Sequence, residues 1–422
     1  MQSATLDLFA DAPAADAAET PVVATVHRAY RFRLYPNEAQ RVALARTFGC
    51  ARYVYNWGLA RKRDAYRESG KSVGYAALSR ELTALRKTKG TEWLGDVLRS
   101  GMEQSLRDLD FAYSSFFAGH AAFPRFKRRR GAQSVRYVAT AFRVDGTALR
   151  LGKTPGAIPV RWSRALPSAP SSCTVSVDAA GRYHASFLCT VAVTPLPSNG
   201  RTVGVDLGLT HFATLSTGEK VENPRYLEQK LARLAREQRR LARKVKGSAN
   251  YGKQKRRVAK VHARIADQRK DFLHKLTTRL IRENQAVAVE TLNVAGMVKN
   301  RKLARHIGQA GWAEFVRMLD YKAEQYGRAV HRVGRFETTT GLCSACGHRP
   351  GKLPLSVRVW TCEMCSAEHD RDVNAAQNIA ACVSGHAARN AVSACGDGGS
   401  PQRLGAEATV SEAGTGLGAG FR

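Results

Sequence analysis

Two groups of residues in this sequence have the types and the spacing that metal chemistry requires. The first group is two Cys-x-x-Cys motifs with 15 residues between them, formed by Cys343, Cys346, Cys362 and Cys365. This spacing is typical of a tetrahedral thiolate site for one Zn²⁺ ion. Because four protein ligands leave no open coordination position, we expect this zinc to be structural. His348 and His369 flank the motifs and are alternative ligands.

The second group is three carboxylates. Asp206 ends the apolar run "TVGVD", Glu290 ends the apolar run "AVAVE", and Asp372 opens the helical pattern "DVNAAQNIA". Each one alone is explained by an ion pair or a helix cap, and Asp372 is a reasonable N-cap. Together, acids from adjacent strands and a packed helix form a negative cluster that is costly unless cations fill it. Carboxylates suit Mg²⁺, and two such ions about 4 Å apart can hydrolyse a phosphodiester.

The charge of the chain indicates what such a site acts on. The 422 residues include 67 Lys and Arg against 35 Asp and Glu, a formal net charge of +32. A chain this basic needs a polyanionic partner, with nucleic acid as the first candidate and an anionic membrane as the second. No apolar run approaches the length of a membrane span. Nine cysteines without an export signal favour metal binding in a reducing, cytoplasmic compartment.

The elements that must position these residues fall into two kinds. The basic and aromatic alternation of residues 26–35 predicts a strand with one cationic face, and helical patterning follows. Short β-like runs between residues 123 and 193 predict a small antiparallel barrel or sheet. From residue 201 onward, strands alternate with helices, which predicts an α/β sheet. Residues 222–283 carry 20 Lys and Arg against 6 Asp and Glu and form either a nucleic-acid-binding hairpin or a solvated one.

A family resemblance rests on a series of motifs that occur in a fixed order. They are "RLYPNEAQ", "CARYVYNWGL", "FPRFKRR", "GVDLGLTHFATLSTG", "VETLNVAGMVKNRKLARHI", "CSACG…CEMC" and "HDRDVNAAQNI". Together they resemble TnpB, a family of transposon-encoded RNA-guided nucleases related to the miniature type V CRISPR effectors. The resemblance extends from about Arg28 to Cys382.

The resemblance implies a multidomain α/β plus β-barrel protein. A RuvC-like nuclease domain of the RNase-H type carries an inserted four-cysteine zinc finger and follows a wedge-type β-barrel with an inserted helical recognition region. The expected divisions are a disordered arm over 1–26, the barrel over 27–38 and 123–196, the helical region over 39–122, the nuclease domain over 201–337 and 368–383, the finger over 338–367 and a disordered tail over 384–422.

The resemblance also implies a function and the residues that carry it out. Asp206, Glu290 and Asp372 match the family's catalytic acids and are expected to hold two Mg²⁺ ions, with Asp370 as the rival for the third position. A structured guide RNA pairs with double-stranded target DNA beside a short motif that the protein reads. No membrane partner is expected. We expect nucleic-acid contacts from Arg31, Arg33, Tyr35, Tyr53, Asn56, Arg125, Lys127, Arg128, Arg129, Arg239, Arg240, Arg243, Lys255 and Arg256.

Two departures from the family pattern and two other functions accompany this interpretation. The family commonly has Glu-Asp where this chain has Glu290 and Thr291, and often Pro-Ser-Ser-Lys where it has Thr-Thr-Thr-Gly at 338–341. Because all three acids are present, we expect an active Mg²⁺-dependent endodeoxyribonuclease. The alternatives are a guide-directed DNA-binding repressor without cleavage and an RNA-independent transposase acting on element ends.

Overall fold

The computed structural model describes residues 24–334, 339, 341–349, 351, 353–354 and 356–393, with side chains described as far as Val383. Most of the expected N-terminal arm and most of the expected C-terminal tail lie outside these residues. Residues 24–26 belong instead to a strand that begins at Ala24, and residues 384–393 to a helix that ends at Ser393. The chain divides into two compact units, one within residues 25–191 and one that begins at residue 192. Within the described ranges, no helix is both long and apolar enough to cross a membrane.

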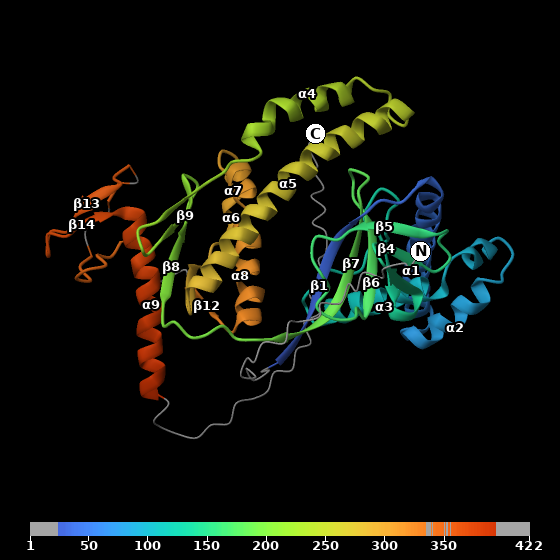
Figure 1. Cartoon of the computed structure of the whole chain (residues 1–422), viewed down its shortest axis with the longest axis horizontal. Helices are drawn as coiled ribbons and strands as arrows, with labels where there is room; N and C mark the ends of the chain where they lie inside the picture. The colour runs from blue at the N-terminus through green and yellow to red at the C-terminus, as the bar shows by residue number, and fades with distance from the viewer. Residues whose placement is uncertain are drawn as a thin grey trace, which may run out of the picture. The chain divides into compact units, whose positions relative to one another are not determined.

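The first unit contains a seven-stranded sheet in the order β2-β6-β7-β1-β5-β4-β3. It curves into a nearly closed barrel, as the fold class implied (Figure 1). Alternate residues of β1, such as Tyr30, Phe32 and Leu34, enter the barrel core. The strands are β1 (Ala24–Leu34), β2 (Gln133–Val138), β3 (Phe142–Asp145), β4 (Ala148–Leu151), β5 (Ala157–Arg161), β6 (Ser172–Val177) and β7 (Tyr183–Val193).

Helices are inserted between β1 and β2. Asn37 and Gln40 form a capping box at the start of the first helix, and Gly70 ends it in the left-handed conformation. The helices of this region are not continuous, because a 3-10 turn lies between the helix that ends at Leu85 and the helix that begins at Arg99. The helices are α1 (Glu38–Ser69), α2 (Tyr75–Leu85), η1 (Glu92–Asp96) and α3 (Arg99–Phe117), and a short η2 (Ala139–Ala141) follows β2.

The second unit contains a five-stranded sheet in the order β10-β9-β8-β11-β12. The three strands β8, β11 and β12 are parallel, while β9 and β10 are antiparallel to their neighbours. The alternating strands and helices from residue 201 onward therefore form an α/β sheet, as the sequence predicted. The strands are β8 (Thr202–Leu207), β9 (His211–Leu215), β10 (Lys220–Glu222), β11 (Ala286–Glu290) and β12 (Ala329–Val333).

Helices cover both faces of this sheet. Side chains of α5 and α8 pack with Val205 and Val289 on one face, whereas Ile379 of α9 packs with Ala288 on the other (Figure 1). Left-handed Gly311 and Gly327 bracket α8. The helices are η3 (Glu228–Lys230), α4 (Leu231–Ala242), α5 (Ala249–Glu283), α6 (Val294–Met297), α7 (Ala304–Ala310), α8 (Trp312–Tyr326) and α9 (Arg371–Ser393).

A small finger is inserted between β12 and α9. Its antiparallel strands β13 (Val359–Thr361) and β14 (Glu368–Asp370) pair Trp360 with His369. A compact cluster of Cys343, Trp360 and Cys362 forms its centre. The chain returns from the finger directly into α9, so the finger interrupts the α/β unit.

Candidate active site and zinc finger

The alternation of side chains along β8 and β11 places two acids on the face covered by α9. Val205 and Val289 lie opposite each other in the parallel pair and face α5 and α8. Successive strand residues point to opposite faces. Asp206 and Glu290, the next residue of each strand, therefore lie side by side on the other face.

The third acid reaches this position because a glycine lets α9 contact the sheet closely. A Cβ atom at Gly204 would lie 2.0 Å from the carbonyl oxygen of Ala376 and 2.7 Å from the backbone nitrogen of Ala380. Only glycine allows the helix backbone to approach a strand so closely. This contact brings the first turn of α9, which carries Asp372, toward the end of β8 where Asp206 lies.

The electrostatics of Asp206 reflect this convergence. Burial raises the pKa of its carboxyl group, and the charges of Glu290 and Asp372 raise it further, to about 7. Both effects disfavour the charged form of the carboxyl group, and among the described residues no cation offsets them at Asp206. Glu290 and Asp372 are therefore close enough to Asp206 to influence its ionisation.

Two neighbours contact the other acids. The Thr339 hydroxyl donates a 2.6 Å hydrogen bond to Glu290 Oε1. The guanidinium of Arg358, from the finger, lies 3.4 Å from Asp372 Oδ1, and the Arg358 side chain is 62% exposed. An ion pair this exposed contributes little, so the hydrogen bond to Glu290 is the stronger constraint.

Asp370, the rival for the third position, has a different role. Its carboxylate accepts hydrogen bonds from the backbone nitrogens of Asp372 and Val373, both at 3.1 Å, and from Lys220 Nζ at 2.6 Å. Burial opposes ionisation, but these hydrogen bonds hold the pKa of Asp370 below its usual range. Asp370 therefore caps α9, and the capping role that the sequence left open for Asp372 belongs to Asp370.

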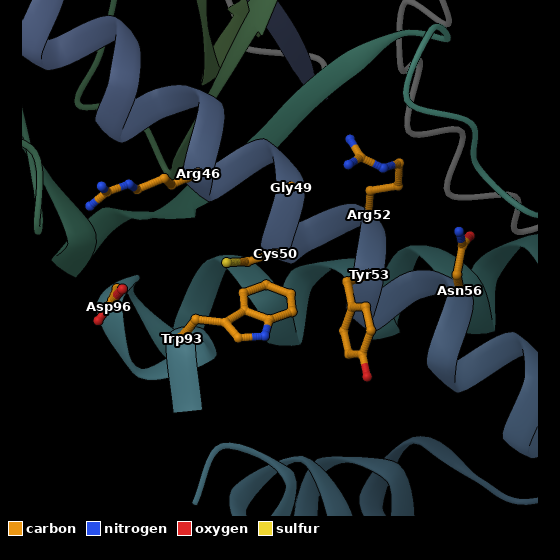
Figure 2. Close-up of a pocket in the computed structure, with 8 residues that line it drawn as sticks. All are labelled: Arg46, Gly49, Cys50, Arg52, Tyr53, Asn56, Trp93 and Asp96. Atoms are coloured by element: carbon orange, nitrogen blue, oxygen red, sulfur yellow. The ribbon is translucent and has the colours of Figure 1, made fainter. Parts of the chain in front are cut away.

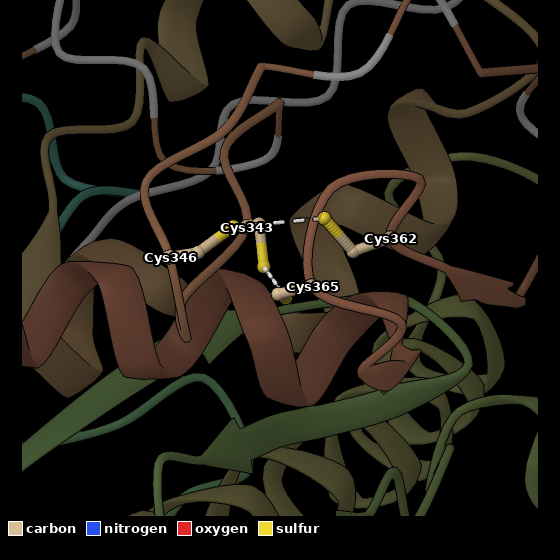
Figure 3. A group of neighbouring side chains, drawn as sticks. All are labelled: Cys343, Cys346, Cys362 and Cys365. Carbon is tan, nitrogen blue, oxygen red and sulfur yellow. Dashed lines mark hydrogen bonds between the residues drawn. The ribbon is translucent and has the colours of Figure 1, made fainter.

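The four cysteines of the finger converge in space. Their Sγ atoms all lie within 4.8 Å of one another, with 3.7 Å between Cys343 and Cys365 and 3.6 Å between Cys346 and Cys362 (Figure 3). Four sulfurs at about 2.3 Å from one Zn²⁺ ion would be about 3.8 Å apart. The sulfur arrangement therefore fits a tetrahedral zinc site.

The two flanking histidines are not members of this group. Among the described residues, the four cysteines are the one set of three or more ligand atoms that converges this closely. His369 Nε2 lies 3.0 Å from Cys343 Sγ, and its ring contacts Trp360. The His348 carbonyl accepts a 2.8 Å hydrogen bond from the Cys343 nitrogen. His369 is therefore placed to form a hydrogen bond with the sulfur of Cys343 without being one of the four zinc ligands.

A buried hydrogen-bond network connects the finger to α9, and sequence reasoning missed it. Asn374 accepts from the Ser344 nitrogen at 2.8 Å and donates to the Leu342 carbonyl at 2.7 Å. Asn378 donates to the carbonyls of Thr339 at 2.7 Å and Leu342 at 2.8 Å. Both asparagines are almost fully buried. The only sequence signal was two amides spaced four residues apart on the helix that carries Asp372.

The predicted nucleic-acid residues on β1 are partly available. Arg31 is exposed and lies 3.1 Å from His184 Nδ1, while Tyr35 is 51% exposed. Arg33 is half-buried and opposes Arg161 of β5 in the sheet register. These side chains occupy the outer face of the strand, so the cationic face that the alternation predicted is present.

Tyr53 and Asn56 lie on one side of a cavity between α1 and η1 (Figure 2). The cavity measures about 560 Å³, and Trp93 forms a T-shaped contact with Tyr53 across it. The amide of Asn56 exchanges two hydrogen bonds with the backbone of Lys127, at 2.9 and 2.7 Å. Asn56 thus anchors the 123–131 segment to α1, a structural role that the sequence did not indicate.

The remaining predicted contact residues are exposed. Lys127 directs its ammonium to 3.9 Å from the centre of the Tyr55 ring. The structure leaves accessible the side chains of Arg125, Arg128, Arg129, Arg239, Arg240, Arg243, Lys255 and Arg256. Availability is necessary for binding nucleic acid but does not assign it.

Three family profiles match the chain. One described as "Probable transposase" matches residues 172–301, "Cas12f1-like, TNB domain" matches 312–379, and "Helix-turn-helix domain" matches 25–71. The last description differs from the structure, in which residues 25–71 form β1 and the single long helix α1.

Relatives match nearly the whole chain. A "Putative RNA-guided DNA endonuclease" of Streptomyces pristinaespiralis is 47% identical over 381 residues, covering 90% of this chain and 93% of the relative. The "Putative RNA-guided DNA endonuclease InsQ" of Escherichia coli strain K12 is 34% identical over 387 residues, covering 88% and 94%. Among solved structures, the protein in a Cas12f1-sgRNA-target DNA complex has a similar fold, with a TM-score of 0.53, 12% identity, and coverage of 84% and 99%.

Proposed function

The chain belongs to the TnpB family, and on that premise we propose that it is an RNA-guided DNA endonuclease. The observation that carries the proposal is the convergence of Asp206, Glu290 and Asp372, which raises the Asp206 pKa to about 7. Two relatives named as RNA-guided DNA endonucleases, each matched over more than nine-tenths of its length, support it.

We propose that these three carboxylates are the catalytic residues and hold Mg²⁺. Hard oxygen donors at the end of a buried strand suit this ion, and its charge would offset the repulsion that perturbs Asp206. When bound, a pair of Mg²⁺ ions would supply Lewis acidity and an activated water for phosphodiester hydrolysis. The chain itself orients the acids: Thr339 holds Glu290, and Asp370 caps the helix that carries Asp372.

The finger fits one structural Zn²⁺ held by the four cysteines. The sulfur separations match a closed tetrahedral site, in which no position is open for substrate. Its contribution to the activity is indirect: through Asn374 and Asn378 it fixes the start of α9.

The basic surface supports nucleic-acid partners. In RNA-guided recognition, base pairing reads the target sequence while the protein binds the backbone and a short adjacent motif. We propose that the exposed residues on β1, on the 123–131 segment and on the α4–α5 hairpin contact guide RNA or target DNA.

A plasmid-cleavage assay separates the possible functions. The protein is purified with its co-purifying RNA and incubated with a plasmid that carries the matching target, with and without Mg²⁺. We expect cleavage that requires both RNA and Mg²⁺. Binding without cleavage would instead identify a guide-directed repressor, and cleavage at element ends without RNA would identify a transposase, the activity in one profile's description.

A further inference from the structure

The cavity between α1 and η1 is an open groove with an aromatic and cationic lining (Figure 2). The residues of this α1 groove that matter here are Arg46, Gly49, Arg52 and Tyr53 of α1 with Trp93 and Asp96 of η1. Tyr53 is 36% exposed and Trp93 is 41% exposed, with their ring centres 5.1 Å apart. Large aromatic rings that stay exposed in a hollow of the surface indicate a place where another apolar group packs.

The walls of the α1 groove are held by the packing behind them. Leu94 and Val97 pack with Val54 of α1 in a buried cluster. The indole nitrogen of Trp93 donates a 3.1 Å hydrogen bond to the carbonyl of Gly90, which fixes the ring within its own turn. The shape of the groove is therefore set by the fold.

Gly49 lies on the α1 side of the groove, in the interior of a long helix. Glycine lowers the stability of a helix relative to alanine. No packing contact of the described residues requires it, since a Cβ atom at position 49 would meet only Arg52 Nη2, at 4.0 Å. A partner that lies against the helix backbone at this point accounts for the missing side chain.

The charges of the groove favour an acidic partner. Its two arginines, Arg46 and Arg52, outnumber its one acid, Asp96. Among the described residues neither arginine forms an ion pair, and Arg52 donates a 2.7 Å hydrogen bond to the uncharged side chain of Gln133. An apolar partner that also carries carboxylates would complement both the rings and the guanidinium groups.

The chain itself contains a segment with this chemistry. Residues 1–23, the N-terminal arm, lie outside the described residues and contain four acids but no Lys or Arg, although the chain has 67 Lys and Arg. Within the arm, the sequence "LDLF" at 6–9 places three apolar residues around Asp7. The arm continues into β1, which from Thr25 onward belongs to the same unit as α1.

The lengths of the arm and of the groove are compatible. Fifteen residues join Phe9 to Ala24, and at about 3.3 Å per residue they reach about 50 Å, more than the roughly 30 Å across a small domain. Arg46 and Asn56 line opposite ends of the groove (Figure 2) and are ten residues apart on α1. The groove is therefore about 15 Å long, which accommodates about four extended residues.

We propose that the α1 groove binds residues 6–9 of the same chain. The three apolar side chains of this segment pack against the two aromatic rings, and the carboxylates of Asp7 and Asp11 pair with the two arginines. A bound arm covers Tyr53, which was predicted to contact nucleic acid, so the arm and nucleic acid exclude each other from the groove. This last consequence alone rests on the proposed function.

The test is photo-crosslinking from position 8 of the full-length protein, purified free of nucleic acid. Leu8→p-benzoylphenylalanine introduces a photoreactive apolar side chain, and mass spectrometry identifies the residues to which it crosslinks. We expect crosslinks within one chain to residues 46–56 and 92–96. Crosslinks confined to other segments, or formed between two copies of the chain, would overturn the proposal.

Gly49→Leu and Gly252→Leu form a matched pair of variants for this experiment. Each replaces a helical glycine at which a Cβ atom meets nothing closer than 4.0 Å, so both variants should fold. Because leucine at position 49 fills the groove, we expect the yield of groove crosslinks to fall by about tenfold or more. Gly252→Leu, in α5, should leave the yield unchanged, and equal yields in the two variants would overturn the proposal.

Addition of a short single-stranded RNA tests the competition. We expect the yield of groove crosslinks to fall as RNA saturates the protein, and an unchanged yield would show that the arm and RNA do not share the groove. Failure of the proposed function is a separate result. In that case the wild-type protein would not cleave a matched plasmid, whereas crosslinking without RNA does not depend on cleavage.

Discussion

At the scale of single residues, the polar groups around the three acids have separate tasks. Asp370 is fully engaged by Lys220 and by the first backbone nitrogens of α9. Glu290 is held by Thr339. Among the described residues, no side chain donates a hydrogen bond to Asp206, and burial together with two neighbouring carboxylates raises its pKa to about 7. The acid with the least protein support is therefore the one that most needs a cation.

The raised pKa of Asp206 predicts how stability depends on pH without Mg²⁺. A carboxyl whose folded pKa lies above its unfolded value near 4 lowers stability as pH rises from about 4 to 7, and the loss is complete above about 7. Asp206→Asn removes this penalty. We expect the variant to melt above the wild type at pH 8, by about 3 °C or more, and the difference to vanish near pH 4. Thermal melts in Mg²⁺-free buffer measure it; a difference that does not change with pH contradicts the assignment.

Thr339 predicts a second effect at this scale. A hydrogen bond to a charged group contributes about 1.5–3 kcal/mol. If it orients Glu290 for catalysis, Thr339→Val should slow cleavage by roughly 10–100-fold. Thr339→Ser keeps the hydroxyl and should retain most of the activity. Single-turnover cleavage rates at saturating RNA and target test this, and equal rates for the Val and Ser variants would show that the hydroxyl has no such role.

At the scale of elements, the site depends on how closely α9 approaches β8. The side chain of any residue larger than glycine at position 204 would overlap the backbone of α9, at 2.0 Å from the Ala376 oxygen. The helix cannot yield locally, because Asn374 and Asn378 also tie it to the finger. The third acid is thus positioned by one glycine on the sheet side and two amides on the finger side.

Gly204→Ala should therefore both destabilise the protein and impair cleavage. Overpacking against backbone costs about 1–3 kcal/mol or more. The matched control is Gly252→Ala in α5, where a Cβ atom meets nothing within 4 Å and a gain of up to about 1 kcal/mol is expected. Chemical denaturation gives both values. If the Gly204→Ala variant were as stable and as active as the control, the close contact between β8 and α9 would not be needed to position Asp372.

Loss of zinc should act on the active site through the same helix. Replacing Cys362 and Cys365 by Ser removes two ligands, and structural zinc contributes roughly 10–16 kcal/mol of apparent binding free energy. We expect faster hydrogen exchange in the first turns of α9, residues 372–380, and loss of cleavage. The barrel unit, within residues 25–191, should exchange as in the wild type. Unchanged exchange in α9 together with full cleavage would refute the link between the finger and the third acid.

At the scale of the whole molecule, the sequence predicted what depends on local pattern. The apolar runs "TVGVD" and "AVAVE" predicted β8 and β11, with an acid at the end of each run. The cysteine spacing predicted a group that does converge. An apolar run that ends in an acid and the spacing of two Cys-x-x-Cys motifs are both local features of the sequence, so they can be recognised before any tertiary contact is known.

What the sequence did not predict depends on contacts between distant segments. Asp370 and Asp372 are two residues apart. The hydrogen bond from Lys220 and the direction of α9 identify Asp370 as the helix cap and Asp372 as the member of the acidic cluster. The hydrogen bonds between the Asn56 amide and the Lys127 backbone join residues 71 positions apart, so no local pattern indicates them, and nucleic-acid binding by Asn56 stays a prediction. The register of α4 against α5 is fixed by the buried Glu237–Gln254 contact, which composition cannot show.

The central claim is that Asp206, Glu290 and Asp372 form the nuclease centre and that Asp370 serves only the helix. The most direct measurement is cleavage of a matched plasmid by the RNA-bound protein in Mg²⁺, for Asp206→Ala, Asp372→Asn and Asp370→Asn beside the wild type. We predict that the first two lose cleavage by about 10³-fold or more while target binding persists, and that Asp370→Asn keeps most of its activity. Cleavage by Asp206→Ala at the wild-type rate, or loss of cleavage in Asp370→Asn with Asp372→Asn still active, would contradict this account.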